Sequence, residues 1–228
     1  MKVKVGQLVT RIAGMAGVFG LVLFLPAGTI DWWAGWAFLI LFLGFVIVLS
    51  AWLLRYNPDL LAERMSGIGH PDQKTWDKVY LVWTGFAFFA WLALMSLDAV
   101  RFRWSHVPRW FQGAGALILL GSFYLFFLTF RENTYLSPVV RIQKERGQTV
   151  VSTGPYRYVR HPMYAAFALM TVGTALLLGS WYGLSGVPIL IGMVARRAVL
   201  EEQVLRQELA GYCAYEARVR FRLVPYIW

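Results

Sequence analysis

One short segment of the chain concentrates side chains that bind charged groups. Residues 154–164 read Gly-Pro-Tyr-Arg-Tyr-Val-Arg-His-Pro-Met-Tyr and lead directly into an apolar run. A proline suits the first turn of a helix, where its missing N–H costs nothing. The free backbone N–H groups at such a helix start favour an anion, and arginine can bind a carboxylate or phosphate through two hydrogen bonds. The candidate ligand-binding residues here are Tyr156, Arg157, Tyr158, Arg160, His161, Pro162 and Tyr164.

Two adjacent glutamates follow the next apolar run. Glu201 and Glu202 would point about 100° apart on a helix, with Arg197 four residues before the first and Arg206 four residues after the second. These spacings alone predict ordinary surface ion pairs. Because the pair lies at the mouth of a helical hairpin that begins at His161, it can also accept hydrogen bonds from an ammonium group or ribose hydroxyls. We therefore add Arg197, Glu201 and Glu202 to the candidates.

The two clusters together indicate which chemical groups the ligand should carry. A molecule with a carboxylate, an ammonium group, ribose hydroxyls, an aromatic base and a positively charged centre would engage all of these side chains. S-adenosylmethionine has this combination, and aromatic faces attract its sulfonium through cation–π interactions. We expect it as the cofactor. No Gly-x-Gly-x-x-Gly motif follows a predicted strand, so a soluble-type nucleotide fold has no support.

The same residues resemble a known family. The segment 154–164, the Glu201-Glu202 pair and the tail Gly211-Tyr-x-x-Tyr-x-x-Arg-Val-Arg-x-Arg-Leu-Val-Pro225 are similar to the isoprenylcysteine carboxyl methyltransferase family and its bacterial relatives. That family also resembles phospholipid methyltransferases. The stretch from Glu132 to Gln148 matches the bacterial members. The resemblance covers about residues 131–228.

The resemblance implies an integral membrane enzyme that binds S-adenosylmethionine without a Rossmann fold and methylates a lipophilic acceptor. In the family the Arg-His-Pro-x-Tyr segment and the Glu pair line the cofactor pocket. The acceptor stays open among an isoprenylcysteine-like carboxylate, a phospholipid amine and a thiol, because Ala210-Gly211 stands where eukaryotic members have Phe-Gly. No catalytic residue can be named. The cofactor-site residues that the resemblance implies are Arg160, His161, Tyr164, Glu201 and Glu202.

Two other functions remain open. A membrane reductase resembling sterol C14 reductases would share the His-Pro-x-Tyr element and bind NADPH, although a 2′-phosphate would require additional arginines. A non-enzymatic membrane scaffold would use both clusters only to anchor interfaces. A metal site is not expected, because the chain has one cysteine, Cys213, and three dispersed histidines.

The elements that must position these residues are apolar helices. Of the residues 58% are hydrophobic and 15% charged, and the mean hydropathy is +0.54, which is typical of a polytopic membrane protein. The net charge of +10 does not indicate a nucleic-acid partner, because the basic residues are spread between apolar runs. Membrane lipids and a lipophilic small molecule are the expected partners; the oligomeric state stays open. By length, the predicted spans are about 12–30, 32–54, 79–97 and 110–130, with a tight hairpin formed by 163–178 and 182–195.

We therefore expect an all-α integral membrane protein with about six transmembrane helices, of which the last two form a helical hairpin. A C-terminal amphipathic helix should follow, because Leu205, Leu209, Tyr212, Tyr215 and Val219 recur at helical spacing. The chain reads as one membrane-embedded domain over 1–228. It consists of a four-helix part, 1–130, and a part that holds the cofactor-binding loop, the hairpin and the C-terminal helix, 131–228.

The basic residues predict the orientation. Nineteen of the 22 lysines and arginines lie in the N-terminal flank and in segments 55–78, 131–160 and 196–222, whereas only Arg101, Arg103 and Arg109 fall on the opposite side. By the positive-inside rule, both termini and the cofactor site should be cytoplasmic. The expected location is a bacterial inner membrane.

Overall fold

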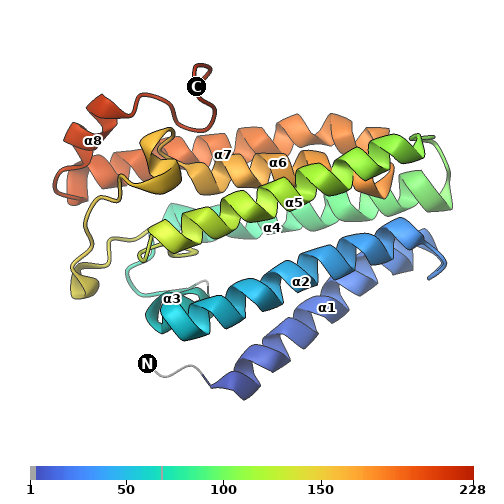
Figure 1. Ribbon diagram of the computed structural model, residues 1–228, viewed down its shortest axis with the longest axis horizontal. Coiled ribbons are helices and arrows are strands. Elements are labelled where there is room, and N and C mark those ends of the chain that lie inside the picture. Colours follow the sequence, from blue (N-terminus) through green and yellow to red (C-terminus); the bar gives the residue numbers. More distant parts are fainter. Residues whose placement is uncertain (1–3, 68) are drawn as a thin grey trace.

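The computed structural model describes residues 4–67 and 69–228, and within these ranges the regular structure is entirely helical. The long helices run side by side as a bundle, with short helices and irregular segments at one end (Figure 1). In chain order the α-helices are α1 (Val5–Ala27), α2 (Trp33–Tyr56), α3 (Pro58–Ser66), α4 (Thr75–Ser96), α5 (Arg109–Glu132), α6 (Pro162–Leu178), α7 (Trp181–Glu208) and α8 (Tyr212–Arg218). The short helical turns are η1 (Leu97–Arg101), η2 (Lys144–Arg146) and η3 (Gly154–Arg157).

Five helices are long and apolar enough to cross a membrane: α1, α2, α4 together with η1, α5 and α7. A bilayer core about 30 Å thick requires roughly 20 helical residues. The predicted polytopic all-α fold is therefore confirmed. The fifth predicted span, 163–178, is the 17-residue apolar helix α6, which is shorter because Gly179 ends it in a left-handed conformation (φ 79°). Most of α6 is buried inside the bundle, so lipid does not set its length.

The C-terminal region differs from the prediction. The expected span 182–195 is the first half of α7, whose 28 residues continue as one helix through Pro188 and the charged residues to Glu208. The expected amphipathic helix is divided, because the chain turns at Gly211 (φ 84°) before the short helix α8. Tyr212 and Tyr215 pack in a buried cluster with Tyr156 rather than facing a membrane surface. The polar extension of α7 is tolerated because its buried charged side chains, Arg197 and Glu202, have partners inside the protein.

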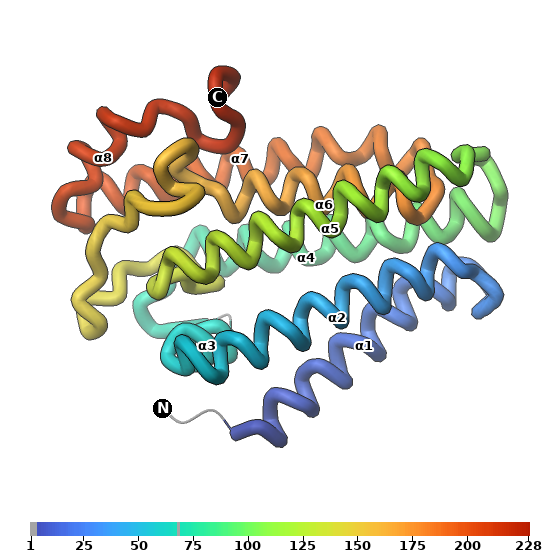
Figure 2. The backbone as a smooth tube through the Cα atoms, viewed as in Figure 1, coloured from blue at the N-terminus to red at the C-terminus, as the bar shows by residue number. Residues whose placement is uncertain are grey.

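The connecting segments that are rich in basic residues lie at one end of the bundle, and those with few basic residues lie at the other. The start of α1, the α2–α4 connection with α3, the segment between α5 and α6, and α8 all lie at one end (Figure 2). That end carries the four basic segments. The three remaining arginines, Arg101, Arg103 and Arg109, lie at or beside the connection between α4 and α5 at the opposite end. The side of the membrane that each end faces stays a prediction.

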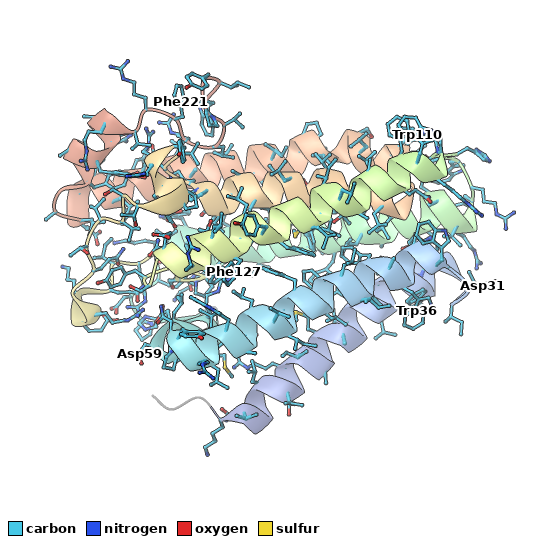
Figure 3. All side chains as sticks on the ribbon, viewed as in Figure 1. Asp31, Trp36, Asp59, Trp110, Phe127 and Phe221 are labelled. Carbon is cyan, nitrogen blue, oxygen red and sulfur yellow. The ribbon has the colours of Figure 1, made fainter. Side chains whose placement is uncertain are left out.

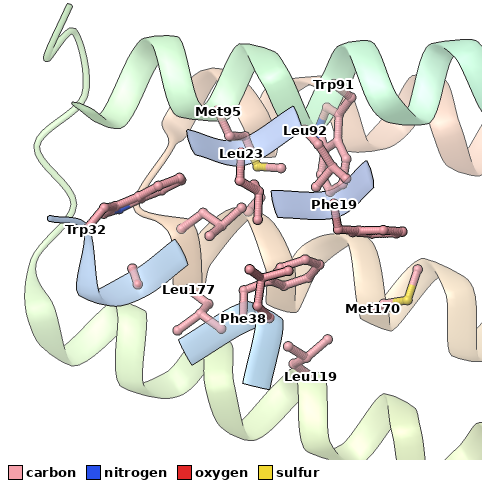
Figure 4. Packing of buried hydrophobic residues seen from close by; sticks show 14 of the residues in the cluster. Phe19, Leu23, Trp32, Phe38, Trp91, Leu92, Met95, Leu119, Met170 and Leu177 are labelled. Carbon is pink, nitrogen blue, oxygen red and sulfur yellow. The ribbon is translucent and has the colours of Figure 1, made fainter. Parts of the chain in front are cut away.

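A single apolar cluster joins the two halves of the chain. Phe19 and Leu23 of α1 meet Phe38 of α2 and Leu92 of α4 at its centre (Figure 4). Helices α5, α6 and α7 contribute to the same cluster. The N-terminal helices therefore pack directly on the hairpin that carries the candidate residues, and they can hold it in place.

Helices α5 and α6 approach each other very closely at two glycines. A Cβ atom at Gly115 would lie 2.4 Å from the backbone nitrogen of Leu177, and one at Gly173 would lie 2.7 Å from that of Leu119. Small residues allow such close contact between membrane helices. A Cβ atom at Gly113, two residues before Gly115, would have no neighbour within 4 Å among the described residues.

We expect Gly115→Ala to destabilise the protein by about 1–3 kcal/mol, because backbone atoms cannot yield to the new methyl group as a side chain could. Gly113→Ala is the matched control, and it should be neutral or slightly stabilising because alanine is the better helix former. The measurement is the midpoint of thermal unfolding in detergent. Equal midpoints for the two variants would show that the close contact between α5 and α6 is not needed.

Candidate functional site

A pocket lies at the basic end of the bundle, where polar side-chain atoms crowd together around α3, α8 and the α5–α6 connection (Figure 3). Its walls come from residues 133–151, the start of α6, the end of α7, and α8. The cavity volume is about 110 Å³. The polar and aromatic residues that line it include Asn133, Tyr135, Arg141, Gln148, Tyr156, Arg160, His161, Tyr164, Arg197, Glu201, Tyr212 and Tyr215.

The start of α6 is closed by the C-terminal tail. Pro162 occupies the first helical turn, as expected. The backbone N–H groups of Arg160 and His161, however, donate to the carbonyl oxygens of Phe221 and Arg222 at 2.9 Å each. The two N–H groups that precede α6 are therefore unavailable to an outside anion, contrary to the sequence-based expectation of free donors. Carbonyl oxygens of the C-terminal tail occupy the position in which an anion was expected.

Glu202 is the centre of a buried ionic cluster. Its carboxylate accepts from Arg160 at 2.7 Å and Arg222 at 2.9 Å, and it contacts His161 and Arg206 at 3.2 Å each. The side chain is fully buried. Burial of one carboxylate is tolerable here because several cationic groups compensate its charge. Glu202 thus joins the start of α6, the end of α7 and the tail, and it does not line the pocket.

Arg160 completes the connection to the tail. Its guanidinium also donates to the carbonyl oxygens of Val219 at 2.7 Å and Arg220 at 2.8 Å. Burial disfavours the charged form of Arg160, but its hydrogen bond with Glu202 and the negative charges of the glutamates outweigh burial and raise its pKa. The anion that this arginine binds in the structure is therefore an internal one.

Glu201 points into the pocket and belongs to a second polar network. One of its oxygens accepts from the Tyr164 hydroxyl at 2.7 Å, and that hydroxyl accepts from Arg197 at 2.9 Å. Arg197 also donates to Asp77 at 2.9 Å and to the carbonyl oxygen of Pro138 at 3.1 Å. The other carboxylate oxygen of Glu201 has no hydrogen-bond partner among the described residues. This oxygen can accept from a ligand.

Asp77, at the start of α4, anchors both this network and the pocket wall. Its side chain is fully buried and accepts from Gln73 and from the backbone N–H of Val140, each at 2.9 Å. Glu63 of α3 anchors the same wall, because Arg141 donates to its two oxygens at 3.0 and 2.7 Å. Burial opposes ionisation of Glu63, but these bonds and one from Ser137 lower its pKa overall. Two acidic residues of the N-terminal half therefore fix the wall around residues 137–141.

Aromatic residues form the remaining wall. The rings of His161 and Tyr164 stack with centroids 5.3 Å apart. Burial raises the pKa values of Tyr156, Tyr212 and Tyr215, so these phenols stay neutral and can donate hydrogen bonds. The Tyr212 hydroxyl is buried and has no hydrogen-bond partner in the part of the chain that the structure describes. A buried polar group without a partner is costly, and this hydroxyl is free to form a hydrogen bond with a ligand.

The structure places six of the ten sequence-predicted site residues in the pocket wall and the other four outside it. Tyr156, Arg160, His161, Tyr164, Arg197 and Glu201 come together in the pocket wall. The other four are absent from the described lining: Arg157 and Tyr158 are exposed, Pro162 is buried in the helix start, and Glu202 is buried in the ionic cluster. Residues that sequence reasoning did not select include Asn133, Arg141, Gln148, Tyr212 and Tyr215.

Much of the chain that forms the pocket is similar to a known protein family. Residues 110–210 match the family model described as phospholipid methyltransferase. This segment is therefore similar to the phospholipid methyltransferase family. The match covers α5, α6, α7 and the segment between α5 and α6, so it contains most of the pocket wall. No curated protein matches the chain.

The match to this family model confirms, at the level of the family, the resemblance that the sequence shows. Together with the apolar helices, it supports a methyltransferase of the membrane. It also favours methyl transfer over the reductase and scaffold alternatives. Within residues 4–67 and 69–228, the structure has no group of three or more His, Cys, Asp or Glu side chains that could hold a metal ion.

Proposed function

We propose that the protein transfers a methyl group from S-adenosylmethionine to a lipophilic acceptor, with the pocket as the cofactor site. The observation that carries this proposal is the meeting of Glu201, Tyr164, Arg197 and three buried tyrosines inside a segment largely matched by a methyltransferase family. When bound, S-adenosylmethionine supplies a methyl group on a positively charged sulfur, so transfer needs no covalent enzyme intermediate.

The residues present fit the groups of this cofactor. The free carboxylate oxygen of Glu201 can accept from an ammonium group or a ribose hydroxyl. The unpartnered hydroxyl of Tyr212 offers a hydrogen bond from the opposite wall. The faces of the buried tyrosines can contact the adenine and attract the sulfonium. The chain would thus orient the cofactor and exclude water, which are the main requirements for direct transfer.

The cavity is small for a cofactor of this size. Its volume of about 110 Å³ is below the roughly 300–1,000 Å³ of typical small-molecule sites. Residues 137–141 are anchored by Asp77 and Glu63. Residues 144–151 are held mainly by local bonds, such as that from the Gln143 N–H to Gln148 at 2.8 Å. We infer that residues 144–151 move outward to admit the cofactor.

The entry routes of the two substrates and the membrane location are further parts of the proposal. A lipophilic acceptor would reach the pocket from the bilayer, while the cofactor would arrive from the aqueous phase at the basic end of the bundle. We propose that this end is cytoplasmic, with both termini on that side, because it holds eighteen of the 21 lysines and arginines that the structure describes. A bacterial inner membrane fits this assignment.

The test is calorimetric titration of the detergent-purified protein with S-adenosylhomocysteine. The wild type should bind, and Glu201→Gln should weaken binding by about 10-fold or more, since hydrogen bonds to charged groups contribute roughly 1.5–3 kcal/mol. Tyr212→Phe should weaken binding while leaving the unfolding temperature unchanged or higher, because its hydroxyl has no partner to lose. No binding by the wild type would refute the proposed cofactor.

The matched control is Glu208→Gln. Glu208 lies on the same helix but pairs with Lys74 at 2.6 Å on the outside of the pocket. Its substitution should leave the affinity for S-adenosylhomocysteine unchanged. If Glu208→Gln weakened binding as much as Glu201→Gln, the effect would come from the overall charge of the site and not from a contact by Glu201.

A further inference from the structure

Arg64, in the last turn of α3, is an inward-lying arginine without an acceptor. Arg141, Arg160 and Arg197 each donate three hydrogen bonds to carboxylate, carbonyl or hydroxyl oxygens. Arg64 is only partly exposed, yet it has neither a hydrogen bond from its side chain nor an ion pair within the described chain. Its neighbour Glu63 is already occupied by Arg141 and Ser137. A guanidinium in this position lacks the anion that would normally compensate it.

The guanidinium of Arg64 lies beside an apolar cluster. Its guanidinium carbon lies 5.1 Å from the centre of the Phe130 ring. Phe130 belongs to a cluster of apolar side chains from α2, α3, α5 and the start of α6, which includes Leu60, Leu61, Leu136 and Met163. The ring faces the guanidinium, and five N–H donors remain to be satisfied. A ligand here would need an anionic group next to a hydrocarbon portion.

This apolar cluster is continuous with the candidate cofactor pocket. Leu136 and Met163 belong both to the cluster and to the pocket lining. Burial and the positive charge of Arg197 lower the pKa of Arg64 to about 10. The side chain therefore stays charged at neutral pH, close enough to the polar network of the pocket to feel its charges.

We propose that Arg64 binds the anionic group, a carboxylate or a phosphate, of the lipophilic acceptor, and that the apolar cluster around Phe130 holds the adjoining hydrocarbon. This inference rests on the proposed function, which supplies the acceptor. It assigns recognition of the acceptor to α3, outside the matched segment 110–210. Leu136 and Met163, which belong to both the cluster and the pocket lining, would then mark where the acceptor meets the cofactor.

The experiment measures binding of single-chain amphiphiles to the full chain in an uncharged maltoside detergent. The probes are dodecanoate, dodecyl phosphate and the neutral dodecanol, with inorganic phosphate as a head group without a chain. The wild type should bind at least one of the two anionic amphiphiles about 10-fold or more tightly than dodecanol, and the preferred one identifies the head group. Arg64→Gln should abolish this preference, whereas Arg64→Lys should keep part of it. Inorganic phosphate should not bind measurably.

Arg55→Gln is the matched control. Arg55 occupies the last turn of α2 at the same end of the bundle, is exposed, and has only the Tyr56 ring beside it, at 5.6 Å. Its loss should not change the preference for anionic amphiphiles. An unchanged preference in Arg64→Gln would overturn the proposal, as would a wild type without preference or inorganic phosphate bound as tightly as dodecyl phosphate.

Titration of the same preparations with S-adenosylhomocysteine separates this inference from the proposed function. Wild type and Arg64→Gln should bind S-adenosylhomocysteine equally, which also shows that the variant is folded. If the wild type bound anionic amphiphiles through Arg64 but did not bind S-adenosylhomocysteine, the cofactor assignment would fail and the anion site would stand. If S-adenosylhomocysteine bound normally but Arg64→Gln had no effect on amphiphiles, only the anion site would fail.

Discussion

Replacing Glu202 by glutamine is expected to destabilise the protein by about 3–5 kcal/mol, because removal of one partner leaves buried charges without compensation. Arg160, Arg222, Arg206 and His161 all converge on this one carboxylate. Glutamine keeps the shape of the side chain but removes the negative charge. Its amide group would direct N–H donors at guanidinium groups, which are donors themselves. The start of α6 and the tail should therefore separate.

The control for Glu202→Gln is the same substitution one residue earlier. Glu201 is 28% exposed and holds one hydrogen bond, from Tyr164. Glu201→Gln should cost no more than about 1.5 kcal/mol, because the glutamine carbonyl can still accept from Tyr164, while it weakens binding of S-adenosylhomocysteine. Thermal unfolding in detergent measures both variants. If the two substitutions lowered the unfolding midpoint equally, the assignment of stability to Glu202 and of ligand binding to Glu201 would be wrong.

The second large effect is expected at Asp77, far from the family segment in sequence. Asp77→Asn removes the charge that compensates Arg197 while keeping the size of the side chain. Both groups are buried, so we expect a loss of about 3–5 kcal/mol. Because Arg197 also holds the Tyr164 hydroxyl that positions Glu201, the affinity for S-adenosylhomocysteine should fall as well.

A double-mutant cycle tests this reasoning. Arg197→Gln alone leaves Asp77 buried without its partner, whereas the double variant Asp77→Asn, Arg197→Gln leaves two neutral groups. The double variant should therefore be more stable than the sum of the single losses indicates, with an interaction energy of about 0.5–3 kcal/mol. The unfolding midpoints of the four proteins give this energy. Strictly additive losses would mean that the two side chains act independently.

The sequence predicted the helical architecture well because each span leaves a local signal. Apolar runs of sufficient length identified α2, α4 and α5 within a few residues, and Gly179 marked the hairpin turn. The run 12–30 identified α1 but missed its first turns, since the helix begins at Val5. The end of α7 was missed because charged residues normally end an apolar run. Here the charges of Arg197 and Glu202 are compensated within the protein, so the helix continues.

The site was predictable only in part, because its partners come from distant positions. The cluster at 156–164 was recognisable from composition, but nothing local showed that the anion for Arg160 would be Glu202 or that the tail would close the start of α6. Glu201 and Glu202 are chemically identical neighbours, and only their surroundings distinguish a side chain that faces the pocket from one that is buried. Asp77 lies 120 residues from Arg197, and no periodicity connects them.

The closure of α6 by the tail has a consequence for how the protein matures. Arg160 receives its carbonyl partners from residues made about sixty positions later. During synthesis the hairpin of α6 and α7 can therefore insert into the bilayer before its binding site exists. The nascent chain should acquire affinity for its small-molecule ligand only after the last segment has left the ribosome and folded back. Ligand binding would then be one of the last steps in the biogenesis of the protein.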